Sequence, residues 1–236
     1  MQVSALWRYP VKSLAGESLD SALLTLEGVA GDRVVHVRGS RGLLTGRTRH
    51  ALLSLPGGTG PDGAPLVAGE PWDSPRVAGL VQEAAGPDAL LVPYVGHERF
   101  DVLNLLVATD GAIDLLGHDV RRLRPNLVIS GVEGDAERTW PGQALAIGEV
   151  LIGLHSVRQR CIVTTIDPDT GDQELDVLRR IRRDFGGEIA LNSWVIRPGT
   201  IRVGDHATLV PTSEVPERLG GWIVGAPYLA NLPSSR

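Results

Sequence analysis

RQRCIVTTIDPDTG, at residues 158–171, contains the single cysteine of the chain, Cys161, between a basic run and a turn sequence. The DPDTG end combines a turn-initiating aspartate, a proline that fixes φ and a glycine suited to positive φ, so it predicts a tight turn at 167–171. We expect the apolar run 162–166 to form a short strand that this turn closes, with Cys161 at its entrance. A side chain in that place can reach a cleft.

Short β-branched or leucine-rich runs, bounded by Gly, Pro, Asp or Asn, recur along the rest of the chain. They predict further strands at 3–6, 22–26, 34–37, 43–44, 66–68, 127–130, 150–154, 194–196, 201–203 and 207–210. Two segments predict helices, one at 110–116 and one that Asp172 caps and Gly186 ends. The Gly- and Pro-rich stretch 57–75 predicts turns or a loop. The fold class is therefore α+β and mostly β, with barrels or sandwiches and few helices.

Length and composition narrow the classes of function. The 236 residues, 42% of them hydrophobic, suffice for one large domain or two small packed ones. A net charge of -5 argues against a nucleic-acid partner. We find no apolar run long enough for a membrane span and no leader pattern, so we expect a cytoplasmic location. One cysteine allows neither an internal disulfide nor an iron–sulfur cluster on the chain's own thiolates, so redox chemistry would need another cofactor.

Two residues stand out from this composition. The basic residues are 22 arginines and one lysine, Lys12, whose flexible ammonium differs chemically from a guanidinium. Arg158 and Arg160 lie within three residues before Cys161 and favour its thiolate, which is a soft ligand for a metal already bound by sulfur. The alternative is that Cys161 packs as a small buried hydrophobe, as lone cysteines commonly do. The residues alone leave both interpretations open.

Other polar and aromatic residues have structural explanations. The six histidines show no metal-ligand spacing, so we expect no zinc site. Trp140 is expected in a core or an interface. The basic run at 179–183 has acidic neighbours and is expected to be a solvated helix face.

Several segments together resemble the MOSC (molybdenum cofactor sulfurase C-terminal) family, in particular the mitochondrial amidoxime-reducing component and its bacterial relatives. They are YPVKSLAGESL at 9–19, GDR at 31–33, LTGR at 44–47, RPNLVISG at 124–131, LAIGEVLI at 145–152, RCIVTTIDPDTG at 160–171 and RPGTIRVGD at 197–205. The resemblance implies an N-terminal β-rich domain at 1–95, packed against a MOSC β-barrel at 96–212, and a tail at 213–236. Apolar clusters at 222–224 and 228–232 of that tail are expected to pack on the barrel or on a partner.

The resemblance also implies a cofactor and its site. The cofactor is molybdopterin-bound molybdenum, whose metal is held by the pterin dithiolene, by oxo ligands and by Cys161, the catalytic residue. The residues implied as cofactor-binding are Lys12, Ser13, Arg33, Arg47, Arg124, Asn126 and Arg160. Because they come from both halves of the chain, we expect the cofactor between the two domains. Arg33 and Arg47 have an alternative as surface arginines, and Asn126 as the start of a strand.

The chain departs from the family in two places. It has DVLNL at 101–105 where the family usually has a polar, proline-containing approach, and Gln159 where the animal proteins tend to have a serine. The resemblance therefore carries no cofactor contact over to 101–105.

The function that the resemblance implies is reduction of small N-hydroxylated compounds, such as amidoximes or hydroxylamines. Electrons are expected from a separate ferredoxin, flavodoxin or flavoprotein reductase, since the chain has no cluster or flavin motif. The alternative is a non-catalytic carrier of the cofactor, or of sulfur as a Cys161 persulfide. A third interpretation is a pyridoxal phosphate enzyme with a Schiff base on Lys12. Cofactor binding explains the loop motif around Lys12 better.

Overall fold

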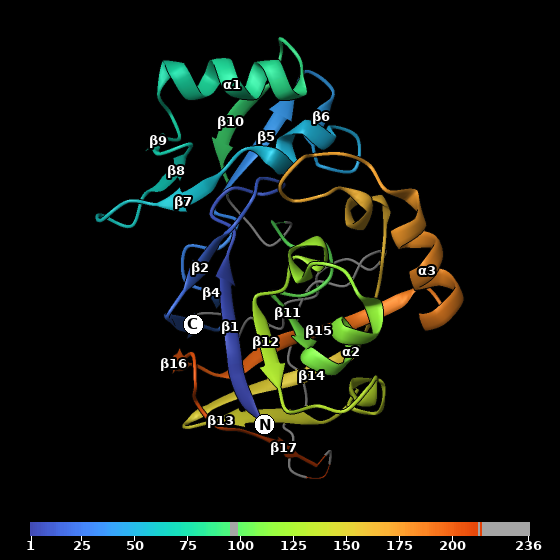
Figure 1. The fold of residues 1–236 in the computed structure, drawn as a ribbon. Coiled ribbons are helices and arrows are strands. Elements are labelled where there is room, and N and C mark those ends of the chain that lie inside the picture. The colour runs from blue at the N-terminus through green and yellow to red at the C-terminus, as the bar shows by residue number, and fades with distance from the viewer. Residues whose placement is uncertain (95–98, 212, 214–236) are drawn as a thin grey trace, which may run out of the picture.

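The computed structural model describes residues 1–94, 99–211 and 213. Within these residues the chain is mostly β with three α-helices and several sheets, so the α+β prediction is confirmed (Figure 1). The boundary expected between 95 and 96, and the apolar clusters at 222–224 and 228–232, lie outside the described residues. None of the helices in the described ranges combines the length and apolarity that crossing a membrane requires.

The largest sheet has eight strands in the order β17-β13-β14-β15-β11-β12-β1-β2. Its strands are β1 (Gln2–Arg8), β2 (Glu17–Leu19), β11 (Leu105–Thr109), β12 (Leu127–Ser130), β13 (Ala144–Ile147), β14 (Val150–Gln159), β15 (Glu188–Arg197) and β17 (Ala207–Val210). Only the β11–β12 pair of this sheet is parallel. A bridge between Gln2 and His206, with a 2.9 Å hydrogen bond from Ala207 N to Met1 O, brings β1 beside β17. The sheet thereby closes on itself as a barrel.

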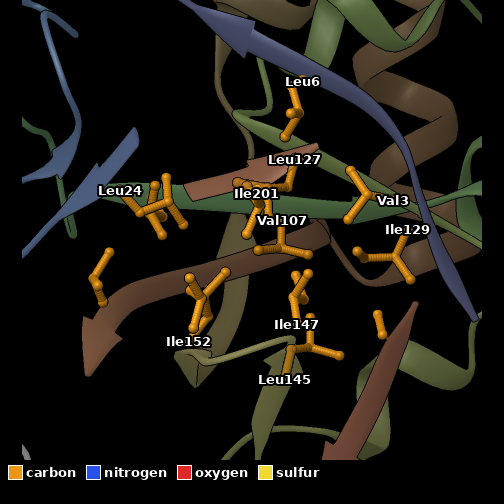
Figure 2. Packing of buried hydrophobic residues seen from close by; sticks show 14 of the residues in the cluster. Val3, Leu6, Leu24, Val107, Leu127, Ile129, Leu145, Ile147, Ile152 and Ile201 are labelled. Carbon is orange, nitrogen blue, oxygen red and sulfur yellow. The ribbon is translucent and has the colours of Figure 1, made fainter. Parts of the chain in front are cut away.

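Leucine and β-branched side chains fill the interior of this barrel. They come from most of its strands and from β3 (Ser21–Thr25) and β16 (Gly199–Arg202), which pair with each other, and β3 also pairs with β4 (Gly28–Val29). Figure 2 shows them pointing toward one another, and all ten labelled residues are at most 1% exposed. Complete burial of one such side chain stabilises the fold by about 2 kcal/mol. Trp140 belongs to this core, which confirms its predicted structural role.

Two smaller sheets and α1 (Pro75–Ala85) build the other end of the molecule. One sheet contains β5 (Val35–Gly39), β6 (Gly42–Leu44) and β10 (Leu90–Pro93); the other contains β7 (Gly57–Thr59), β8 (Pro65–Val67) and β9 (Glu70–Pro71). Helix α1 lies across this end (Figure 1) and was not predicted. Its signals are present in the sequence: Ser74 accepts a hydrogen bond from Val77 N, and Val77, Val81 and Ala85 are buried at intervals of four.

The helix at α2 (Asp110–Leu116) confirms the prediction for 110–116. Helix α3 (Leu175–Phe185) ends at Gly186, which is left-handed with φ 63°, as predicted. The predicted cap at Asp172 is wrong. The carbonyl of Asp172 accepts a hydrogen bond from Asp167 N, and Glu174 N donates to Thr165 O, so this stretch closes the preceding turn and the helix begins later.

The segment after Cys161 differs from the predicted strand. Residues 162–166 contain a 3₁₀ helix, η5 (Ile162–Thr165). The hydroxyls of Thr164 and Thr165 donate to the carbonyls three residues earlier, at 2.8 and 2.6 Å, and these local bonds favour a tight turn over a strand. The DPDTG turn is confirmed: Gly171 N donates to Asp167 O, and the φ of Gly171 is 77°.

Candidate functional site

A cavity of about 530 Å³ opens between loops of the first half of the chain and the second half. Pockets that bind small organic ligands have volumes of roughly 300–1,000 Å³. The structure brings all eight residues of the predicted site to its wall: Lys12, Ser13, Arg33, Arg47, Arg124, Asn126, Arg160 and Cys161. The wall is basic. Of the described residues that line it, seven are lysine or arginine and two, Asp101 and Glu188, are acidic.

Cys161 lies where β14 has ended and η5 begins, with extended backbone angles and a partly exposed side chain. Three guanidinium groups interact with it electrostatically. The charge of Asp101 has the largest effect on Arg47 and raises its pKa. Burial lowers that pKa, and the charge of Cys161 raises it by a smaller amount. Burial lowers the pKa of Arg158, and that of Arg160 to about 10, while Cys161 partly opposes both shifts. The thiol therefore faces a basic cavity and is not a fully buried packing residue.

Asp101 lies among three cations on one side of this cavity. Its Oδ1 is 3.2 Å from Lys12 Nζ, and its Oδ2 is 2.9 Å from Arg47 Nη2 and 3.4 Å from Arg158 Nη2. Burial alone would raise the pKa of Asp101, but the three cations outweigh it and hold that pKa well below its usual range. Burial also lowers the pKa of Lys12, an effect that Asp101 opposes.

The ring of Tyr9 lies between two arginines that line the cavity. The guanidinium carbons of Arg33 and Arg124 lie 4.9 and 4.3 Å from its ring centroid, within the range of cation–π contacts. The hydroxyl of Tyr9 donates to Pro125 O at 3.1 Å, and burial raises its pKa to about 12. The buried carboxylate of Asp32 pairs with Arg33. These contacts fix both guanidinium planes before any ligand binds.

Asn126 is 1% exposed, and its side chain bonds to the protein. Its Oδ1 accepts a hydrogen bond from Leu106 N at 3.2 Å, and its Nδ2 donates to Trp7 O and to Asp32 Oδ2, both at 3.3 Å. Asn126 thus ties β1 to β11 and supports the Asp32 carboxylate behind the cavity.

Three predicted site residues have backbone conformations that are rare without glycine. The φ angles of Ser13, Arg33 and Arg124 are 73°, 53° and 57°; among described non-glycine residues, only Ala68 and Ala190 also have positive φ. Such conformations cost roughly 1–3 kcal/mol each and concentrate at functional sites. The loops that carry these residues are therefore shaped for the cavity at some expense of stability.

Arg160 offers the clearest indication of a missing acceptor. Its Nη2 donates to Leu123 O at 2.6 Å, but its buried Nε has no hydrogen-bond partner among the described residues. An orphaned buried donor and a surplus of basic side chains fit an anionic ligand with polar edges. The donor set therefore fits a phosphorylated pterin. No group of three or more His, Cys, Asp or Glu side chains gathers as a metal site in the described part of the chain.

Several residues that line the cavity or contact its arginines were not predicted as site residues. Arg158 was quoted beside Cys161, and Tyr9 and Asp32 lie within the quoted motifs, so their positions were available as signals. Asp101 stood out only as a departure from the family. Arg99, which lines the cavity and stacks 4.8 Å from the Phe100 ring centroid, had no signal of its own.

The sequence matches the MOSC domain over residues 101–208 and the MOSC N-terminal beta barrel domain over residues 1–55. It is 36% identical over 100 residues to mitochondrial amidoxime-reducing component 1 of Homo sapiens, which is 37% of this chain and 29% of that protein. It is 31% identical over 107 residues to the molybdenum cofactor sulfurase of Bombyx mori, which is 43% of this chain and 12% of that protein.

The matched stretch covers less than a third of the length of either relative. Among solved structures, the YUAD protein of Bacillus subtilis aligns with a TM-score of 0.49 and 13% identity, over 88% of this chain and 94% of that one. YiiM of Escherichia coli aligns with a TM-score of 0.43 and 13% identity, over 95% and 74%. On the two domain matches, which follow the order of the sequence, this chain belongs to the MOSC-domain proteins that carry a MOSC N-terminal beta barrel domain.

Proposed function

We propose that the cavity binds molybdenum cofactor, with Cys161 as the protein's ligand to the metal, and that the protein reduces small N-hydroxylated compounds. One observation carries the proposal: a partly exposed thiol faces a cavity with seven basic and two acidic side chains, in a chain whose net charge is -5. The relatives named as amidoxime-reducing components support the choice of reaction.

When bound, the cofactor supplies a two-electron redox centre. The chain's own residues hold it in place. Arg33 and Arg124, fixed on the Tyr9 ring, present planar donors for the pterin edge or a phosphate, and Arg160 Nε offers a further buried donor. Ser13, held at positive φ, presents a hydroxyl at the cavity wall. Asp101 stays ionised at neutral pH because its pKa is so low, so it is not the proton donor of the reaction.

The electron donor in this proposal is a separate ferredoxin, flavodoxin or flavoprotein reductase. We also retain, as proposals, the division into residues 1–95, 96–212 and 213–236 and the cytoplasmic location. The topology bears on how the first two parts combine, since β1 lies in the eight-stranded sheet and β3 pairs with β16. The N-terminal residues therefore complete the barrel as well as one wall of the cavity.

A reductase assay tests the proposed reaction. Protein from a host that makes molybdopterin is supplied with an artificial electron donor and an aromatic amidoxime, and amidine formation is measured. We expect turnover by the wild type and a loss of at least about a hundredfold in Cys161→Ser, because the serine lacks the soft thiolate. Equal turnover by the two proteins would contradict the role of Cys161, and no turnover by protein with a full complement of molybdenum would rule the reaction out.

The second candidate function is a carrier that passes on the cofactor, or sulfur as a Cys161 persulfide. The similarity to a molybdenum cofactor sulfurase favours it. A persulfide needs Cys161 but not the cations that hold a pterin. Arg124→Ala is a poor discriminator because Arg124 also donates to Leu14 O and stacks on Tyr9. The side chain of Arg47 is 49% exposed, so Arg47→Gln is the cleaner variant.

Mass spectrometry separates the sulfur carrier from the reductase, and the reductase assay separates a cofactor carrier, which holds molybdenum without turnover. A sulfur carrier retains one added sulfur atom on Cys161 in both the wild type and Arg47→Gln and carries no pterin. A cofactor-binding reductase releases pterin, less of it in Arg47→Gln, and its Cys161 carries no added sulfur.

A further inference from the structure

The carboxylate of Asp101 lies where the cavity concentrates positive charge. It contacts Lys12 from the loop after β1, Arg47 from the loop after β6 and Arg158 from β14, at 2.9–3.4 Å. In these ion pairs between described residues, three cations face one carboxylate. Carboxylate and phosphate oxygens accept hydrogen bonds from the same donors at the same distances. Asp101 therefore lies where an oxyanion of a ligand would bind.

The three cations also interact with groups other than Asp101. Arg158 Nη1 donates to Asn192 Oδ1 at 3.2 Å, and Asn192 in turn donates to Ser156 Oγ at 3.0 Å. The Nζ of Lys12 lies over the ring of Tyr94 at 5.9 Å, and Arg47 interacts with Cys161. Arg158 and Lys12 therefore keep contacts of their own if the carboxylate leaves, and Arg47 keeps its electrostatic interaction with Cys161.

The carboxylate of Asp101 is accessible to solvent, whereas its apolar neighbours are buried. Its neighbours Phe100 and Leu103 are 8% and 9% exposed and fix the backbone of this irregular segment. The side chain of Asp101 is 37% exposed, so solvent reaches its carboxylate, and rotation about its side-chain torsions is the smallest movement that would separate it from the cations.

We propose that Lys12, Arg47 and Arg158 form an oxyanion subsite beside Cys161, and that Asp101 is its exchangeable internal counterion, displaced by a phosphate-type dianion of the ligand. A dianion replaces the single charge of Asp101 with two and balances the three cations better. A monoanionic carboxylate gains nothing over Asp101. The residue thus selects for ligand charge and keeps the cations paired when no ligand is bound. This inference rests on the proposed function only for the identity of the natural ligand.

Titration calorimetry with inorganic phosphate at low salt tests the exchange on cofactor-free protein from a host without pterin synthesis. Asp101→Asn removes the competing charge and should bind phosphate at least about tenfold more tightly than the wild type. The control is Asp176→Asn, which removes the same charge from a carboxylate that is 90% exposed and paired with Arg179 on α3. Its affinity should equal that of the wild type. Equal affinity of Asp101→Asn and the wild type, or equal tightening in both variants, overturns the proposal.

A loss variant keeps the test decisive if Asp101→Asn folds poorly. Arg47→Gln, at a half-exposed position, removes one cation and should bind phosphate more weakly than the wild type; unchanged affinity overturns the subsite. The pterin content of Asp101→Asn from a molybdopterin-competent host then shows whether the natural anion belongs to the cofactor: retention at or above the wild-type level supports the exchange, and loss of pterin contradicts it.

The two proposals fail in different ways. Absence of molybdenum and pterin from the wild type overturns the proposed function and leaves the phosphate result standing. Equal phosphate affinity of Asp101→Asn and the wild type overturns the exchange and does not affect the proposal of cofactor binding.

Discussion

The guanidinium of Arg124, which lines the cavity, lies over the ring of Tyr9, 4.3 Å from its centroid. Tyr9→Phe keeps this stacking and removes the hydrogen bond to Pro125 O, so it should lower the free energy of unfolding by about 1 kcal/mol and retain pterin. Tyr9→Leu loses the stacking as well and should release pterin. Urea unfolding and pterin analysis check both variants, and equal pterin content in the two would show that the ring does not position Arg124.

The titration of Tyr9 should make the free energy of unfolding depend on pH. Burial raises its pKa from 10.0 to about 12, against the opposing charges of Arg124 and Arg33. The unfolded chain therefore releases this proton first, so the stabilisation is complete below pH 10 and is lost as the pH rises through 12. The loss should reach roughly 3 kcal/mol relative to Tyr9→Phe. The absorbance difference between the two proteins follows the phenolate directly, and a midpoint near the ordinary tyrosine value contradicts the buried position.

The loop at Gly16 allows the Tyr9 ring its place. A Cβ added at Gly16 would lie 2.5 Å from Tyr9 Cδ1 and 2.7 Å from Arg8 O. Gly16→Ala should therefore displace the ring, cost about 2 kcal/mol of stability and lower pterin content. Gly79→Ala on α1 is the matched control, because a Cβ there meets nothing within 4 Å and should stabilise the helix by up to about 1 kcal/mol. Equal thermal unfolding shifts in the two variants would show that the Tyr9 contact is not tight.

Some strands and helices could be predicted from the sequence and others could not, depending on which interactions stabilise them. Strands such as β12 and β17 were predicted at their observed bounds, because their apolar runs are bounded clearly by turn residues. The strand predicted at 162–166 is wrong, because threonine hydroxyls donate to local carbonyls there and outweigh β-propensity. Helix α1 was missed although Ser74 and Pro75 mark its start, since the prediction of turns or a loop ended at Pro75 and no element was assigned to the residues after it.

The site was predictable where motifs carry it and not where distant segments meet. The motifs named all eight residues that the structure brings to one cavity. They did not indicate that the side-chain amide of Asn126 forms hydrogen bonds with Leu106, Trp7 and Asp32, because those bonds depend on the packing of β1 against β11. Asp101 could not be assigned either, since its three cations come from three separate parts of the chain.

The molybdenum content of purified protein tests the central claim most directly. Wild type and Cys161→Ser are produced in the same molybdopterin-competent host, and metal and released pterin are measured per chain. We predict near-stoichiometric molybdenum and pterin in the wild type, and a molybdenum content lower by at least about tenfold in Cys161→Ser with the fold intact. Wild-type protein without molybdenum, or equal molybdenum in the two proteins, would contradict the assignment of Cys161 as the metal ligand in this cavity.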